Sequence, residues 1–183
     1  MNNNLSDELR GLISQMLKPL NNLKFNLVIE GLSGYKILPY NPNDTKDTQL
    51  LQKLTTIANT TGNEINKIGI HKTRPNEAGN EIEKFIKEAM IKENFTPQTP
   101  LTQTGKRKSA GYPDIEFKDQ FDRTTYLECK TYNTDSENSA FRSFFVSPSN
   151  DFKVTENAHH FMLSFEMYNS EQKNNKYVYK CKS

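Results

Sequence analysis

Apolar positions recur at helical spacing in three stretches of the chain. The first lies in residues 5–20 and the second in residues 47–58, where the turn residues 61–63 are expected to close the helix. The third pattern is the clearest: it starts at Pro75, where a missing N–H costs nothing, and ends near Asn94. Its acidic residues gather in the N-terminal half, which complements the helix dipole.

Beyond residue 109 the pattern changes to the alternation of apolar and polar positions that is typical of strands. The predicted strands cover residues 112–117, 123–132, 140–146, 160–168 and 176–181. The polar segment 118–122 is short enough to join the first two strands as a hairpin. Two extended runs, 23–29 and 35–38, are expected to form an edge or a second hairpin. Helices followed mostly by strands predict an α/β or α+β fold, with a mixed central β-sheet flanked by helices.

The composition limits the classes of protein without choosing one. With 183 residues, the chain fits a single domain. Its 24 Lys and Arg against 22 Asp and Glu exclude a polycationic tail, but not a nucleic-acid binder with one basic face. Two cysteines and three histidines are too few and too scattered for a zinc or histidine cage, and we interpret His159 and His160 as structural. With no long apolar run and no secretory signal, we expect a cytoplasmic protein with no membrane partner.

The chemistry-bearing residues gather on the first two predicted strands. If Ile115 faces the core, Asp114 points the other way, and if Cys129 faces the core, Glu128 and Lys130 point outward. Neighbouring strands would then bring two carboxylates and one ammonium group onto a single face. The alternative is a solvated hairpin with an ion pair between its strands.

Such a group of side chains suits a divalent cation. Two close carboxylates repel each other unless a cation lies between them, and oxygen ligands with waters to spare favour Mg²⁺ or Mn²⁺. We expect Asp114 and Glu128 to hold the metal, with the backbone carbonyl of Cys129 as a third ligand. Lys130 would orient the attacking water and offset negative charge at phosphorus, which is sufficient for phosphodiester hydrolysis.

The spacing of these residues resembles a known superfamily of nucleases. Pro113-Asp114 is followed after thirteen residues by Glu128-Cys129-Lys130, which is similar to the PD-(D/E)xK motif. Together with the preceding amphipathic helix and the chain length, it looks like a type II restriction endonuclease. The resemblance implies a restriction-endonuclease-like core, with Asp114 and Glu128 as metal ligands and Lys130 as the catalytic lysine.

The resemblance also implies an acidic residue on the preceding helix that completes the metal site. Glu81 is the natural candidate, and Glu77, one turn earlier, is the alternative. We expect one nuclease domain over residues 1–183, with its catalytic core in residues 75–168. Residues 1–73 would then serve dimerisation or DNA contact.

Basic and hydroxyl side chains around the motif are candidates for contact with DNA. The expected DNA-binding residues are Lys106, Arg107, Lys108, Arg142, Ser143 and Lys153. The basic run 106–108 immediately precedes the first motif strand, where it could reach backbone phosphates beside the scissile bond. The alternative interpretation of that run is a solvated loop.

These observations predict a Mg²⁺-dependent type II restriction endonuclease that cleaves double-stranded DNA at a specific sequence, with Mn²⁺ as a substitute metal. One active site per chain and two strands to cut predict a homodimer. Two alternatives remain open. One is a structure- or damage-directed nuclease, of the resolvase or repair type, with the same core. The other is a non-catalytic DNA-binding protein with structural carboxylates.

Overall fold

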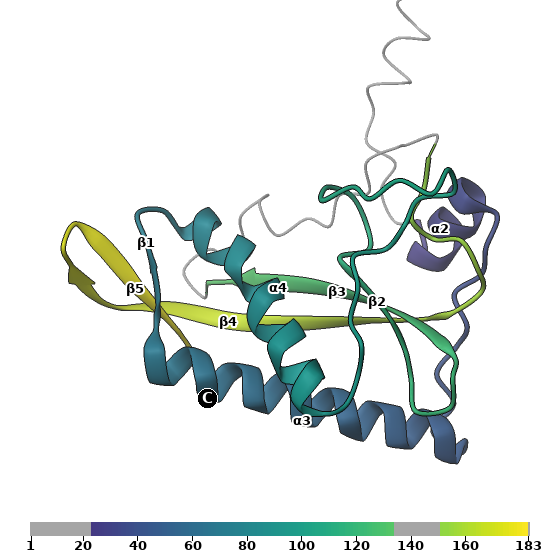
Figure 1. Ribbon diagram of the computed structural model, residues 1–183, viewed down its shortest axis with the longest axis horizontal. Helices are drawn as coiled ribbons and strands as arrows, with labels where there is room; N and C mark the ends of the chain where they lie inside the picture. The colour runs from purple at the N-terminus through teal and green to yellow at the C-terminus, as the bar shows by residue number, and fades with distance from the viewer. Residues whose placement is uncertain (1–22, 134–150, 183) are drawn as a thin grey trace, which may run out of the picture.

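The computed structural model describes residues 23–133 and 151–182 of the chain. Its helices are α2 (Phe25–Ser33), α3 (Thr45–Ile68) and α4 (Pro75–Lys92), and its strands are β1 (Ile70–Lys72), β2 (Ile115–Lys118), β3 (Thr124–Tyr132), β4 (His159–Lys173) and β5 (Lys176–Cys181). The strands form one five-stranded sheet in the order β1-β5-β4-β3-β2, shown in Figure 1. None of the helices in this part of the chain could cross a bilayer.

The sheet is mixed, as the sequence predicted. Strand β3 pairs antiparallel with β2 and parallel with β4, whereas β5 pairs antiparallel with both β4 and β1. The helices flank this sheet, so the predicted fold class is confirmed. The two motif strands form the predicted hairpin, in which Ile115 stands opposite Leu127. The short strand β1 was not predicted, because three residues are too few to display a period.

Side chains alternate between two hydrophobic clusters on the two faces of β3. Leu127 and Cys129 point into the larger cluster, which contains the apolar faces of α3 and α4. Tyr126 points to the opposite face, where it packs with Ile29 of α2 and with Val154. Because both faces are covered, β3 is buried from Thr124 to Cys129. The strand that carries the motif is therefore the most enclosed of the sheet.

Three predictions about the N-terminal half were wrong. Residues 23–29, expected to be extended, lie largely in α2, because Phe25, Ile29 and Leu32 are spaced for one helix face, and Gly34 ends the helix in the left-handed conformation at φ 81°. Turn residues 61–63 do not end α3, which continues to Ile68 because Thr61 and Ile65 extend its buried stripe. Residues 35–38 form no strand beyond a bridge between Ile37 and Ala158.

Helix α4 agrees with its predicted bounds, and α3 contributes Leu50, Leu54 and Ile57 to the same core. The predicted helix over 5–20 and the predicted strand over 140–146 lie outside the described residues.

A network of charged side chains fixes the β2–β3 turn to the start of α3. Asp119 accepts hydrogen bonds from the backbone N–H groups of Phe121 and Arg123, which closes the turn. The Arg123 guanidinium donates to Asp119 at 2.7 Å and to Asp47 of α3 at 2.7 Å. Asp47 is only 3 % exposed and also accepts from the backbone N–H of Asn41. The hairpin is therefore locked in place relative to α3 at the end where its strands meet.

Removing Asp47 tests this lock. Asp47→Ala should lower the free energy of unfolding by about 3 kcal/mol, because it leaves part of the Arg123 guanidinium buried without its partner. Asp44→Ala is the matched control, since Asp44 only caps α3 by accepting from the N–H of Lys46, and its loss should cost about 1 kcal/mol. Urea unfolding measures both, and equal losses would contradict the role of the network.

Candidate active site

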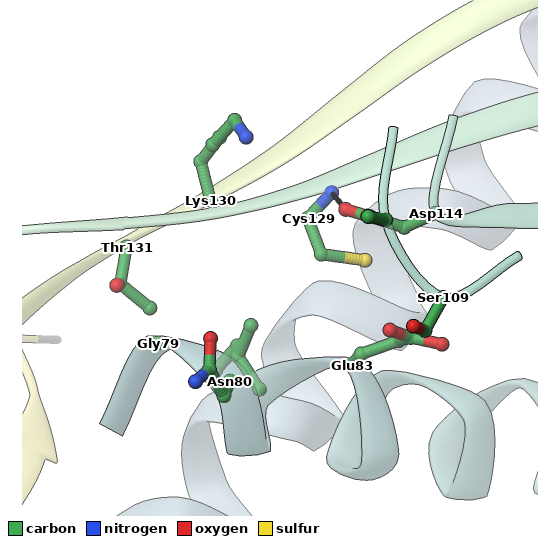
Figure 2. Close-up of a pocket in the computed structure, with 10 residues that line it drawn as sticks. Gly79, Asn80, Glu83, Ser109, Asp114, Cys129, Lys130 and Thr131 are labelled. Atoms are coloured by element: carbon green, nitrogen blue, oxygen red, sulfur yellow. Dashed lines mark hydrogen bonds between the residues drawn. The ribbon is translucent and has the colours of Figure 1, made fainter. Parts of the chain in front are cut away.

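The hairpin register brings the two motif segments side by side. Because Ile115 pairs with Leu127, the preceding Asp114 comes level with Glu128. The Asp114 carboxylate accepts a hydrogen bond from the backbone N–H of Cys129 at 2.9 Å, which Figure 2 shows as a dashed line. A backbone bond of this kind fixes the position of the carboxylate more firmly than a contact between two flexible side chains.

Glu128 is deeply buried, with 5 % of its surface exposed, and its two carboxylate oxygens differ in their surroundings. Oε1 lies 2.6 Å from the ammonium nitrogen of Lys130, whose side chain is 45 % exposed. Oε2 is buried and has no hydrogen-bond partner among the residues that the structure describes. A buried acceptor without a partner is rare and costly in folded proteins, and it indicates a position where a ligand, an ion or a water is required.

Burial and mutual repulsion perturb both carboxylates. Burial raises the pKa of Glu128 above its ordinary value, and the negative charge of Asp114 raises it further. Burial also raises the pKa of Asp114, although the N–H of Cys129 and the charge of Lys130 oppose the shift. A cation between the two groups would offset the cost of burying two negative charges so close together.

A cavity of about 600 Å³ opens between β3 and the N-terminal half of α4. Its polar lining includes Asp114, Glu83 and Ser109, which lie close together in Figure 2. In the same view Thr131 points from β3 toward α4, while Lys130 points to the other side of the strand. Helix and strand approach closely at Gly79, where an added Cβ would lie 3.0 Å from the Thr131 hydroxyl oxygen.

The acidic residue that α4 contributes to this cavity is Glu83, not the expected Glu81. The Glu81 carboxylate is paired with the Lys72 ammonium of β1 at 2.5 Å. The alternative, Glu77, accepts from the Thr73 hydroxyl, which together with the N-terminal backbone lowers its pKa. Glu83 lies four residues after Gly79 and therefore on the side of α4 that approaches β3. That spacing is the signal that sequence reasoning missed.

Neutral aromatic groups lie against Glu128 on the α2 side of the sheet. Glu128, Tyr112 and His160 line one hollow of about 270 Å³ whose wall is otherwise mostly apolar. The Tyr112 hydroxyl lies 2.5 Å from Nδ1 of His160. Burial lowers the pKa of His160 to about 4, so the imidazole is neutral at pH 7 and adds no positive charge beside the carboxylate. This agrees with the interpretation of His160 as structural.

The predicted DNA-binding residues fall into three groups. Lys106 and Arg107 are exposed on the loop before Asp114, where they are available for contact. Lys108 forms an ion pair with Asp151 at 3.1 Å. Lys153 is 2 % exposed, and its ammonium donates to backbone carbonyls, so the prediction that it contacts DNA directly does not fit its position. Arg142 and Ser143 lie outside the described residues.

The donors present suit a hard divalent cation. Among residues 23–133 and 151–182, no three or more His, Cys, Asp or Glu side chains are grouped to form a complete metal cage. Mg²⁺ does not require such a cage, since it commonly uses one or two carboxylates and takes its other ligands from water and substrate phosphates. The unpartnered Oε2 of Glu128 beside Asp114 meets that requirement.

Comparison with known proteins places the chain among the type II restriction enzymes. The family model of the type II restriction enzyme MjaV family matches residues 20–183, and the chain belongs to this family. A curated relative, the type II restriction enzyme MjaV of Methanocaldococcus jannaschii, is 38 % identical over 176 residues, which cover 88 % of this chain and 76 % of the relative. The predicted class, a type II restriction enzyme and hence an endodeoxyribonuclease, is confirmed.

One solved structure resembles the chain more distantly. It is the crystal structure of the tetrameric restriction endonuclease SfiI bound to cognate DNA, with a TM-score of 0.37 and 12 % identity. The similarity covers 76 % of this chain and 64 % of the SfiI chain, so this chain spans less than two thirds of the length of SfiI.

The burial of Glu128 and its repulsion by Asp114 predict that the site destabilises the metal-free protein. Because the pKa of folded Glu128 is raised, the wild-type protein loses stability as pH rises above the ordinary Glu value of 4.5. Glu128→Gln removes that loss. In chelator at neutral pH, its free energy of unfolding should therefore be about 1 kcal/mol higher than that of wild type. Thermal melts measure the difference, which should shrink as pH falls toward that value.

Glu88→Gln on the exposed face of α4 is the control and should leave stability unchanged. A Glu128→Gln protein that is less stable than wild type in chelator would show that the ionised Glu128 side chain does not destabilise the metal-free protein.

Proposed function

We propose that the chain hydrolyses phosphodiester bonds in double-stranded DNA at a specific sequence, with Mg²⁺ as its metal and Asp114, Glu128 and Lys130 as its catalytic residues. The observation that carries this proposal is the buried, unpartnered Oε2 of Glu128 beside a second carboxylate. The ion pair with Lys130 engages only Oε1, which leaves Oε2 available to a cation. Mn²⁺ is expected to substitute for Mg²⁺, because both ions accept carboxylate and water ligands.

Each of the three residues has a distinct part in this proposal. Asp114 and Glu128 would hold the metal with the backbone carbonyl of Cys129, and the metal supplies Lewis acidity toward a phosphate oxygen. Lys130 is partly exposed and already lies beside Glu128, so its ammonium can reach a water next to the bound phosphate. It would orient that water and offset the charge that develops at phosphorus. The PD-(D/E)xK resemblance supports these parts.

Glu83 replaces Glu81 as the acidic residue of α4 in the proposal. It lines the same cavity as Asp114, and its negative charge acts on the Asp114 carboxyl. It would therefore be the acidic residue of α4 that assists in holding the metal, while Glu81 is engaged with Lys72.

Binding of the duplex is proposed to use the exposed Lys106 and Arg107 on the loop that leads to Asp114. These side chains can neutralise backbone phosphates near the scissile bond, so they would contribute affinity rather than base specificity. The described residues of each chain hold one such site, and cleavage of both strands at a symmetric sequence would then call for a homodimer.

The decisive experiment compares wild type with Lys130→Ala on plasmid DNA. Wild type should cut at one sequence in Mg²⁺ or Mn²⁺, and in Ca²⁺, whose coordination shell is larger and looser, it should bind without cutting. Lys130→Ala should lose about 10²- to 10⁴-fold in single-turnover rate, because its ammonium acts mainly in the transition state. Its affinity in Ca²⁺ should stay close to that of wild type, since Asp114 and Glu128 are unchanged.

Sequencing of the cut ends identifies the site, and gel shifts in Ca²⁺ measure the affinity. Robust cutting in excess chelator would refute the metal, and wild-type cleavage by folded Lys130→Ala would refute the catalytic assignment. If Lys130 only formed an ion pair with Glu128, its removal would cost about 0–1 kcal/mol of stability and nothing in rate.

Glu83 and Glu81 offer a matched pair on one helix. Glu83→Gln should raise the Mg²⁺ concentration needed for half-maximal cleavage by about tenfold, the loss typical of a residue that orients the metal's shell. Glu81→Gln, which changes only the contact with Lys72, should cut like wild type. Rates measured across a Mg²⁺ titration compare them, and the reverse order would return the role to Glu81.

A further inference from the structure

Lys153 is a buried ammonium group beside the proposed site. Its side chain is 2 % exposed, and its nitrogen donates to the backbone carbonyls of Gly111, at 2.8 Å, and Pro113, at 3.1 Å. These two carbonyls belong to the residues that lead directly into Asp114. A lysine is almost never buried to this extent without a compensating role, since removing the charge from water is costly.

The residues next to Lys153 hold the same loop from its other end. Asp151 accepts hydrogen bonds from the backbone N–H and the hydroxyl of Thr104. The carbonyl of Phe152 accepts from the backbone N–H of Gln103. Residues 151–153 therefore form hydrogen bonds with the connection between α4 and β2 at two separate places. The contact of Lys153 is the one nearest the carboxylates.

The charge of Lys153 also acts on the site. Burial lowers the pKa of the Lys153 ammonium, and the negative charges of Asp114, Glu83 and Glu128 oppose that shift. In return, the positive charge lowers the pKa of both Asp114 and Glu128 against the effect of burial. A buried cation thus lies within electrostatic reach of Asp114, Glu83 and Glu128.

We propose that Lys153 is a positioning residue of the active site, which anchors the segment from Gly111 to Pro113 so that Asp114 is held level with Glu128, ready to bind the metal. The inference rests on the proposed function and extends it, because it assigns a role to a residue outside the motif. A direct contact between Lys153 and a DNA phosphate is the competing role. Its burial and its two carbonyl acceptors disfavour that contact.

The test uses two substitutions at this position. Lys153→Met keeps a long side chain but removes the charge and both hydrogen bonds, whereas Lys153→Gln removes the charge and retains an amide that can donate to one carbonyl. Lys67→Met, at the exposed end of α3, is the control for the loss of one positive charge. Circular dichroism at the assay temperature establishes that each variant is folded before it is compared.

The first measurement is calorimetric titration of the DNA-free proteins with Mn²⁺. Lys153→Met should bind about tenfold more weakly than wild type, the usual cost of losing a residue that orients a metal ligand, and Lys153→Gln should lie between the two. The second measurement is a salt series of DNA binding in Ca²⁺. Both variants should keep the salt dependence of wild type, because no phosphate contact is lost.

The outcomes separate the competing roles. Folded variants with wild-type Mn²⁺ affinity would overturn the proposal and leave Lys153 a purely structural residue. A salt slope reduced by about one, with unchanged Mn²⁺ affinity, would overturn it in favour of a phosphate contact. A wild-type protein that binds no Mn²⁺ and cuts no DNA would instead overturn the proposed function itself, and with it any metal-positioning role for Lys153.

Discussion

Two carboxylates that share a water-poor site repel each other, and much of the structure around Asp114 and Glu128 counters that repulsion. The N–H of Cys129 and the ammonium groups of Lys130 and Lys153 lower the pKa values that burial raises. None of them satisfies Oε2 of Glu128. The protein therefore stabilises the pair enough to fold but leaves it incomplete, which is the condition under which a cation adds the most binding energy.

The parts of the fold that sequence could predict are those that depend on local pattern. The hairpin of β2 and β3 followed from alternation and a short polar turn, and it placed Asp114 opposite Glu128 because register in a hairpin is set by its own turn. Helix α4 followed from its apolar stripe and from Pro75 at its start. The class, a type II restriction endonuclease, was predicted from the same local pattern, since the motif residues lie just before β2 and on β3.

Contacts between distant parts of the chain explain what sequence could not predict. The choice between Glu81 and Glu83 depends on how α4 is rotated against β3, which the close approach of Gly79 to Thr131 decides. The burial of Lys153 depends on the return of the chain past the loop before Asp114, and a lysine gives no hint of burial by itself. In the same way, the pattern of residues 23–29 predicted an extended run, because the packing of Tyr126 and Val154 against α2 is not visible in the local sequence.

The parallel pairing of β3 with β4 sets the order in which the site can come into being. A hairpin such as β2–β3 requires the closure of only a short loop. A parallel pair such as β3–β4 requires a long crossover connection, whose closure costs more conformational entropy. Lys153 lies near the end of that crossover, shortly before β4 begins at His159. A nascent chain that already displays both carboxylates therefore still lacks the contact that holds one of them. If that contact positions Asp114, the site is complete only when the segment that leads into the parallel pair is in place.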